Sequence, residues 1–253
     1  MEQITSRSNP LIARFRKLAN DRKLRRAEGV MVCEGPKMLS EALRWGFAPK
    51  AALVTEDFAF DFPAETRAVR VPADLLRAAA PTQTPQKVLF LAPLPDDRLP
   101  ETLTGKRYLV LDGVQDPGNV GTLWRTADAF GADGLLLLPG CADPWGPKTV
   151  RATMGACFRL PVWEADLDET VSVLDRAGLP LYAAALQDDT LDLRNLDADR
   201  AAVVIGSEGR GVSSAVLSAC AATVKIPMTD RCESLNAAVA GAVVLWELAR
   251  NNF

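Results

Sequence analysis

The sequence contains no histidine among its 253 residues. This absence excludes the Ser-His-Asp triad and the Cys-His pair, and it removes the commonest metal ligand in proteins. An enzyme built on this chain must move protons with Asp, Glu, Lys, Arg, Tyr, Cys or the substrate itself. The five cysteines include no C-x-x-C pair. We therefore expect reduced thiols that pack as small apolar groups, and no metal site.

Long hydrophobic runs are also missing. No apolar stretch approaches the roughly 20 residues that span a bilayer. The first residues, MEQITSRSNP, carry no apolar signal segment. We therefore expect a cytoplasmic protein with no membrane partner. With 48% hydrophobic and 24% charged residues, the chain can build a core without disulfides or bound metal.

The net charge of −3 argues weakly against a nucleic-acid partner, but the charge is unevenly spread. Residues 1–26 hold eight basic side chains against two acidic ones, a net charge of +6. A basic segment on an acidic body is typical of local contact with nucleic-acid phosphates, although a solvated helix face would look similar. Two later basic residues are expected near the active-site end of a sheet. The candidate phosphate contacts are Arg14, Arg16, Lys17, Arg22, Lys23, Arg25, Arg26, Lys148 and Arg151.

Hydrophobic periodicity divides the chain into two α/β halves. The first half predicts helices at 11–26 and 36–45 and strands at 29–34, 51–55 and 88–91, with 56–66 irregular. The stretch 92–106 has three prolines, three acids and no apolar period, so we expect a linker there. The expected domains are therefore 1–91 and 107–253.

The second half alternates strands with helices, which predicts an α/β fold with a mostly parallel sheet. The expected strands are 107–114, 134–138, 179–184, 201–205 and 222–226, and the expected helices are 120–130, 148–154 and 234–249. Ligands of such sheets bind beyond the carboxyl ends of the strands. Three polar segments follow strands in this way.

The first polar segment is DGVQDPGNVGTLWRTADAFG, residues 112–131. Pro117 and Gly118 predict a turn, and Asn119 stands where a helix N-cap is expected. Arg125 then follows about two turns into the helix. The two side chains could share one groove if the first turn is irregular. A plain capping Asn and a surface Arg are the alternative.

The second polar segment is VVIGSEGRGVSS, residues 203–214. A strand, then GSEGRG, then a helix would leave backbone amides free to hold an anion or a polar ligand. The pattern is neither G-x-G-x-x-G nor a P-loop. Glu208 adds a carboxylate to this loop. A tight glycine turn with an exposed Glu is the alternative.

The third polar segment is VKIPMTDRCESLNAAVAGAVVLWEL, residues 224–248. Its loop begins at Pro227, and Ser234 is the expected N-cap of the closing helix. Small residues fill the start of that helix, although an interior glycine costs up to roughly 1 kcal/mol. We therefore expect something to pack tightly against it. A close helix–sheet contact without a ligand is the alternative.

The three segments, in this order, resemble the motifs of the SpoU/TrmH family of RNA ribose 2′-O-methyltransferases, within the SPOUT superfamily. The matching patterns are N-x-G-x-x-x-R-T-A, G-S-E-G-x-G, and I-P-M followed six residues later by S-L-N. This resemblance covers residues 107–250. Residues 4–91, with ITSRSNPLIARFRKLANDRKLRR and GVMVCEGPKMLSEALRWG, are similar to the family's small substrate-binding domain of ribosomal-protein L30e-like fold.

The resemblance implies a trefoil-knotted SPOUT domain, bound S-adenosylmethionine, methylation of a ribose 2′-hydroxyl in structured RNA, and a homodimer with active sites near the subunit interface. The L30e-like domain favours ribosomal RNA over transfer RNA. The implied active-site residues are Asn119, Arg125, Glu208, Ser234 and Asn236. The implied cofactor contacts are Leu138, Gly140, Gly206, Ser207, Ile226, Met228, Ser234 and Leu235.

The chain departs from the family pattern at Asp230, where many members have glycine, and at S-L-N-A-A, which is commonly S-L-N-V-S. A carboxylate at Asp230 would repel RNA phosphate but could help to hold the sulfonium. Arg125 is implied as the residue that activates the hydroxyl. Either it is neutral in a desolvated site, or it stays cationic and leaves the proton to phosphate, water or Glu208.

Three other functions stay open at this point. A transfer-RNA methyltransferase would carry the same motifs. A non-catalytic RNA-binding homologue would keep the fold, although the joint presence of the five active-site residues argues against decay. A methyltransferase acting on a small molecule or a protein is disfavoured by the basic first 26 residues.

Overall fold

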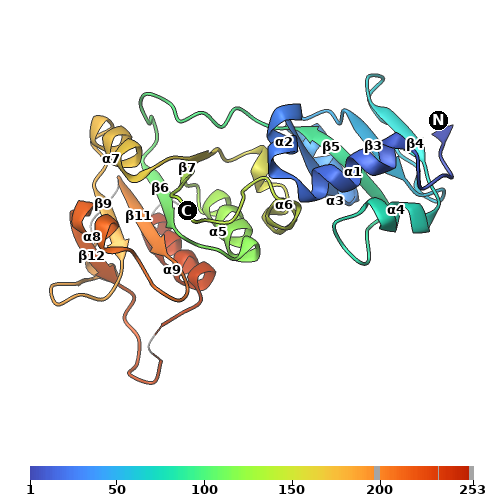
Figure 1. Ribbon diagram of the computed structural model, residues 1–253. Coiled ribbons are helices and arrows are strands. Elements are labelled where there is room, and N and C mark those ends of the chain that lie inside the picture. Colours follow the sequence, from blue (N-terminus) through green and yellow to red (C-terminus); the bar gives the residue numbers. More distant parts are fainter. Residues whose placement is uncertain (197–199, 233, 251–253) are drawn as a thin grey trace. The chain divides into compact units, whose positions relative to one another are not determined.

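The computed structural model in Figure 1 describes residues 1–196, 200–232 and 234–250. The chain packs as two compact units. Unit 1 consists of Met1–Asp96 and Asp143–Arg159, and unit 2 consists of Asp97–Ala142 and Leu160–Phe253. Among the described helices, none has the length and apolarity needed to cross a membrane.

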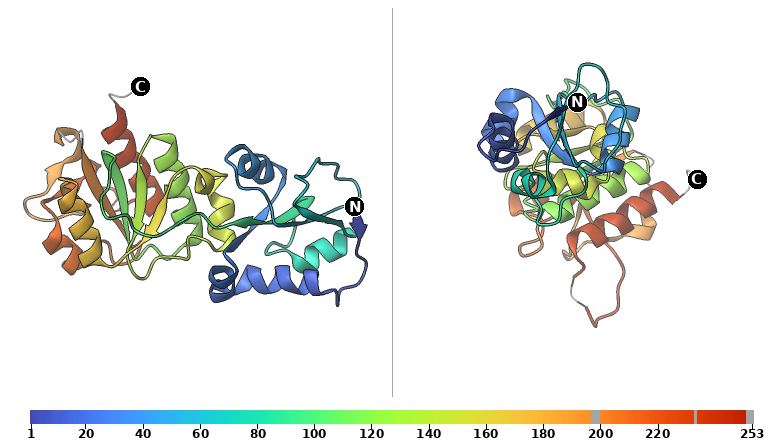
Figure 2. Two further views of the ribbon diagram at one scale, coloured as in Figure 1. Left: turned by 90° about the horizontal axis from the view of Figure 1, so that it is seen from above. Right: turned by 90° about the vertical axis from the view of Figure 1, so that its right-hand side faces the viewer.

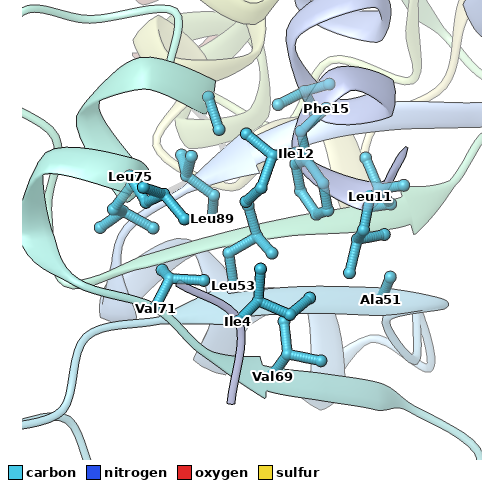
Figure 3. Packing of buried hydrophobic residues seen from close by; sticks show 14 of the residues in the cluster. Ile4, Leu11, Ile12, Phe15, Ala51, Leu53, Val69, Val71, Leu75 and Leu89 are labelled. Carbon is cyan, nitrogen blue, oxygen red and sulfur yellow. The ribbon is translucent and has the colours of Figure 1, made fainter. Parts of the chain in front are cut away.

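Unit 1 is a five-stranded sheet in the order β1 (Glu2–Gln3), β4 (Arg67–Arg70), β3 (Ala51–Val54), β5 (Val88–Pro93) and β2 (Val30–Glu34). β3 and β4 are parallel, whereas β5 is antiparallel to both β3 and β2. Its helices are α1 (Pro10–Asn20), α2 (Arg22–Glu28), α3 (Pro36–Arg44) and α4 (Ala73–Ala79). Figure 3 shows Ile12 and Phe15 of α1 packed over Leu53 and Leu89 of the sheet, beside Leu75 of α4.

The basic helix expected at 11–26 is two helices that meet at Asp21. The backbone of Asp21 is extended, with φ −116° and ψ 103°. Its N–H donates to the Lys17 carbonyl (2.9 Å), and its carboxylate accepts from the Leu24 N–H (3.0 Å). Asp21 therefore ends α1 and caps α2 at the same time. The single-helix prediction is wrong because this one side chain supplies a cap in mid-segment.

A segment from the second half of the sequence belongs to unit 1. Residues Asp143–Arg159 contain α6 (Pro147–Thr153), which packs on β2, and a short 3-10 helix, η1 (Ala156–Phe158). Arg25 is only 4% exposed and donates to the Asp143 carboxylate (2.5 Å) and the Leu18 carbonyl (2.5 Å). Arg159 pairs with Glu41, and the Phe158 ring lies 5.2 Å from that of Phe47. Lys148 and Arg151 thus lie on α6 of unit 1, and their expected place near the active-site end of the sheet stays a prediction.

Unit 2 is a seven-stranded parallel sheet, which confirms the expected α/β class. The strand order is β10 (Leu191–Asp192), β12 (Ala222–Lys225), β9 (Leu181–Ala184), β11 (Ala201–Gly206), β6 (Arg107–Asp112), β7 (Gly134–Leu137) and β8 (Val162–Glu164). In Figures 1 and 2, α5 (Pro117–Ala129) and α9 (Ala237–Ala249) lie side by side on one face of this sheet. α7 (Leu167–Arg176) and α8 (Ser214–Ala219) cover the other face. The trefoil knot stays a prediction.

Candidate active site

The first polar segment forms the start of α5. Asp116 accepts a hydrogen bond from the Asn119 N–H (2.8 Å), and Pro117 supplies the fixed φ that suits a first helical residue. Asp116 is therefore the N-cap, and the N-cap prediction for Asn119 is wrong. Since Asn119 lies inside the first turn, its side-chain amide is available for contacts with other segments.

The second polar segment forms a closed loop after β11. Ser207 and Gly211 exchange two backbone hydrogen bonds, of 3.1 and 2.9 Å. Only glycine fits at Gly206, because a Cβ there would lie 2.2 Å from the Gly211 carbonyl carbon. The N–H of Ser213, just beyond the loop, donates to the Asp112 carboxylate at the end of β6 (2.7 Å). The loop that carries Glu208 is thus held by its own backbone and by the neighbouring strand.

The third polar segment leads into α9. The N-cap of α9 is Asn236, whose side-chain oxygen accepts from the N–H groups of Ala238 (2.9 Å) and Val239 (3.3 Å). The prediction of Ser234 as N-cap is therefore wrong. A Cβ at Gly241 would lie 2.1 Å from a Leu123 methyl carbon, so the small residues do permit tight packing. The close neighbours are Leu123 of helix α5 and, at 3.6 Å, Ile205 of strand β11, while Ala237 and Ala240 line a cavity.

Three polar side chains join the three segments in space. The Asn119 Nδ2 donates to a Glu208 carboxylate oxygen (2.5 Å), and the Asn236 Nδ2 donates to the Asn119 Oδ1 (3.2 Å). A carboxylate can only accept, so the amide of Asn119 has one possible orientation, with its oxygen left for Asn236. Three motifs far apart in the sequence therefore meet in one hydrogen-bonded chain.

Arg125 does not join this chain of contacts. Six residues along a regular helix turn the side chain about 120° from Asn119. Arg125 is exposed, and it has no hydrogen-bond or ion-pair partner within the described residues. The expectation that Asn119 and Arg125 share one groove required an irregular first turn. It fails within one subunit because α5 is regular from Pro117.

A cavity of about 490 Å³ lies beside these side chains at the carboxyl ends of β9, β11 and β12. Its volume is in the usual range for ligand pockets. Six of the eight expected cofactor contacts line it: Gly206, Ser207, Ile226, Met228, Ser234 and Leu235. Leu138 and Gly140 do not. Leu138 is buried in the hydrophobic core, and Gly140, with φ +91°, packs beside Gly113.

The sequence reasoning missed part of this lining. Residues 184–187 line the cavity from the end of β9, and Arg210 and Lys225 add two cations. The strand before residue 184 was expected, and its carboxyl end could have been added to the site on that basis. Arg210 lies within the second polar segment and Lys225 within the third, but the residues around them do not distinguish them from ordinary surface cations.

Two partly buried thiols, Cys141 and Cys220, lie within the electrostatic influence of Asp112. All five cysteines lie in the described part of the chain, and all are free thiols. Burial raises the pKa of Cys141 to about 11, and burial together with the Asp112 charge raises the pKa of Cys220 to about 11. The Cys141 thiol donates to the Leu111 carbonyl (3.3 Å). Neither thiol is therefore suited to accept a proton at neutral pH.

The basic residues of unit 1 differ in accessibility. Arg16, Lys17, Arg22, Lys23, Lys148 and Arg151 are exposed. A shallow concavity at the break between α1 and α2 is lined by Lys17, Arg22 and Lys23, with Asn20 and Asp21. Arg14 is half-buried and held by Glu28, and Arg26 is half-buried too. Arg25 is not available as a phosphate contact, because it is buried against Asp143.

Comparison with known proteins gives a consistent assignment. Residues 106–246 match the SpoU rRNA methylase family, and residues 9–90 match the MRM3-like substrate-binding domain. A relative in Bacillus subtilis, the 23S rRNA (guanosine(2553)-2′-O)-methyltransferase RlmP, is 33% identical over 250 residues, which cover 98% of this chain and 99% of the relative.

Two solved structures have the same architecture along nearly the whole chain. An AdoMet-bound rRNA methyltransferase from Sinorhizobium meliloti has a TM-score of 0.87 at 29% identity, covering 100% of this chain and 98% of that one. The SpoU methyltransferase AviRb from Streptomyces viridochromogenes, in complex with AdoMet, has a TM-score of 0.85 at 27% identity, covering 96% and 99%. The chain belongs to the SpoU rRNA methylase family.

Proposed function

We propose that this protein transfers a methyl group from S-adenosylmethionine to a ribose 2′-hydroxyl of structured RNA, namely ribosomal RNA, in the cytoplasm. The observation that carries the proposal is the hydrogen-bonded chain Glu208–Asn119–Asn236 beside the cavity at the strand ends. The relative from Bacillus subtilis bears the name of a 23S ribosomal RNA 2′-O-methyltransferase and matches the chain end to end.

The cavity fits S-adenosylmethionine in size and in chemistry. Its lining is part apolar and part polar, as a molecule with an adenine, a ribose and an amino-acid tail requires. Gly206, Ser207, Ile226, Met228, Ser234 and Leu235 would hold it. When bound, the cofactor supplies a methyl group on a sulfonium, which is an excellent leaving group. The Glu208 carboxylate lines the same cavity and would favour that positive charge.

The protein aligns the ribose oxygen with the methyl group and provides an acceptor for the proton of the hydroxyl. Asn119 holds Glu208 in place, and Asn236 holds Asn119. The guanidinium of Arg125 stabilises the oxyanion that develops at the ribose as the hydroxyl loses its proton. Glu208, a water or an RNA phosphate then accepts the proton. Ser234, at the cavity wall, would help to orient the ribose.

An exposed apolar stripe on α9 supports a homodimer. Val239, Val243 and Trp246 are 49%, 37% and 52% exposed and recur at helical spacing on one face. Exposed Arg125 lies on α5, the helix packed beside α9. A second copy on this face would bury the stripe and bring Arg125 to a subunit boundary. Arg125 would then serve the partner's site, which explains why it stands apart from Asn119 within one subunit.

Trp246→Glu should convert the dimer into a monomer, because it replaces the largest apolar side chain of the stripe by a charge. Size-exclusion chromatography with light scattering measures the mass. Trp45→Glu is the matched control, since Trp45 is 47% exposed but belongs to unit 1 and is not part of the stripe. A dimer that survives Trp246→Glu would place the interface elsewhere.

RNA binding is assigned to the exposed basic side chains of unit 1. If about six of them meet phosphates, affinity for RNA should fall about a thousandfold between 50 and 200 mM salt. Lys17→Ala and Lys23→Ala, at the α1–α2 concavity, should each reduce the slope of log K against log salt by about one. Filter binding of a 23S ribosomal RNA transcript gives this slope. If the affinity for RNA does not change with salt, the basic side chains of unit 1 do not bind RNA phosphates.

The reaction itself is tested by incubating the protein with methyl-labelled S-adenosylmethionine and a 23S ribosomal RNA transcript, then digesting the RNA to nucleosides. Label in a 2′-O-methylnucleoside is the expected result. If the label is incorporated into transfer RNA but not into the 23S transcript, the substrate is transfer RNA. Binding of RNA without any binding of S-adenosylmethionine by calorimetry would mean a non-catalytic RNA-binding protein.

A further inference from the structure

Arg210 is an exposed cation in the lining of the methyl-donor cavity. It lies two residues after Glu208 on the loop closed by Ser207 and Gly211, and it lines the cavity. Its N–H donates to the Ser207 hydroxyl oxygen (3.3 Å), which fixes its backbone. Within the described residues, its exposed guanidinium has no hydrogen-bond or ion-pair partner.

The chemistry of RNA requires a cation near this point. The 2′-hydroxyl of a ribose is the neighbour of the 3′-oxygen, which carries a phosphodiester. A ribose presented for methylation therefore brings a negative charge within a few ångströms of the reacting oxygen. The site already holds the Glu208 carboxylate, and Asp230 lies exposed two residues beyond the cavity residue Met228. Both would repel that phosphate.

The other nearby cations are less suited to this role. Lys225 also lines the cavity, but it stands opposite Asp192 in the β10–β12 register and has a lysine's single ammonium in place of a planar fork. Arg125 does not line the cavity, and its proposed task is at the reacting 2′-oxygen. Arg210 alone combines a place in the cavity wall, a rigid backbone and a guanidinium that can meet a phosphate with two parallel hydrogen bonds.

We propose that Arg210 binds the phosphodiester attached to the 3′-oxygen of the ribose that is methylated. The proposal rests on the RNA methyltransferase function and adds an anion subsite to it. Arg210 acts on the substrate and not on the methyl donor. It therefore sets how well the target nucleotide is held beside the Glu208–Asn119 pair.

Arg210→Ala tests this subsite. It should raise the KM for a 23S ribosomal RNA transcript about tenfold, leave the Kd for S-adenosylmethionine within about twofold, and reduce the salt slope of RNA binding by about one. Arg210→Lys should recover the salt slope but only part of the KM, because a lysine keeps the charge and loses the planar fork. Turnover at saturating RNA should change less than about threefold for both variants.

Arg200→Ala is the matched control. It removes the same charge from the amino end of β11, at the opposite edge of the sheet, where Arg200 donates to the Ala177 carbonyl (2.9 Å). Its KM and salt slope should match the wild type. An unchanged RNA KM and salt slope in Arg210→Ala would overturn the proposal. So would a weakened Kd for S-adenosylmethionine with normal RNA binding, which would assign Arg210 to the cofactor's carboxylate.

The experiments distinguish a failure of the Arg210 proposal from a failure of the proposed RNA methyltransferase function. Absence of any 2′-O-methyl product from the wild-type protein would refute the proposed function. Filter binding of the same transcript would still show whether Arg210→Ala loses one phosphate contact. An active wild type with an unaffected Arg210→Ala would refute only the subsite.

Discussion

Replacing Arg125 by alanine is expected to lower turnover about 100- to 1,000-fold, because the positive charge that stabilises the forming oxyanion is lost. Arg125 does not line the cavity, so the Kd for S-adenosylmethionine should stay within about twofold. Arg125→Lys keeps the charge but loses the planar fork, and we expect at least a tenfold loss. Single-turnover methyl transfer to a 23S ribosomal RNA transcript measures both variants. Near-normal turnover of Arg125→Lys would contradict the specific role of the guanidinium.

Mixing two inactive variants tests whether Arg125 serves the partner's site. Subunits with Arg125→Ala keep Asn119, and subunits with Asn119→Ala keep Arg125. In a mixed dimer, one site combines the intact Asn119 of one subunit with the intact Arg125 of the other. Random exchange of equal amounts should therefore restore about a quarter of wild-type activity. No recovery after exchange would mean that Arg125 acts within its own subunit.

The core of the candidate site could be predicted because the sheet is parallel. Strands that alternate with helices bring their carboxyl ends to one edge, and β12, β9, β11 and β6 are consecutive in that sheet. The polar segments after these strands therefore converge. Asn119 meets Glu208 and Asn236 across 89 and 117 positions of sequence. The parallel topology predicts that these segments lie close together. It does not predict which side chains form hydrogen bonds with one another.

The two N-cap errors have a common cause, because each local pattern offers two good capping residues. Asp116 and Asn119 are both good N-cap residues, and so are Ser234 and Asn236, so the sequence does not select one of each pair. The structure uses Asp116 and Asn236 as caps. This choice leaves the amide of Asn119 free for the site and gives Asn236 two tasks, since it caps α9 and also contacts Asn119.

The prediction of Arg25 as a phosphate contact is wrong for a different reason. Arg22 and Lys23 are exposed, whereas Arg25 is buried by its contact with Asp143, 118 positions away. No pattern within residues 1–26 reveals that Asp143 folds onto this helix. The same long-range contact explains why α6, with Lys148 and Arg151, lies in unit 1 although the surrounding chain builds unit 2.

Asp143→Ala is expected to destabilise unit 1 by about 3 kcal/mol or more, because it leaves the buried guanidinium of Arg25 without its counter-charge. The Arg25 side chain is 5% exposed and that of Asp143 is 19% exposed, so water cannot replace the lost partner well. Hydrogen exchange measured by mass spectrometry is the suitable assay, because it follows each unit separately. Amides of β2 and α6 should exchange more than about a hundredfold faster, while β6 and β11 keep their protection.

Two further variants show whether burial of the charge is the cause. Asp74→Ala removes the carboxylate of an exposed ion pair with Arg7 in the same unit, where the side chains are 56% and 71% exposed, and it should change exchange in β2 and α6 little. The double variant Arg25→Met with Asp143→Leu removes both charges and should recover much of the lost protection.

Because α6 carries Lys148 and Arg151, Asp143→Ala should also weaken RNA binding, and the double variant should restore it. Equal exchange in Asp143→Ala and wild type would show that α6 is held on β2 by apolar packing alone.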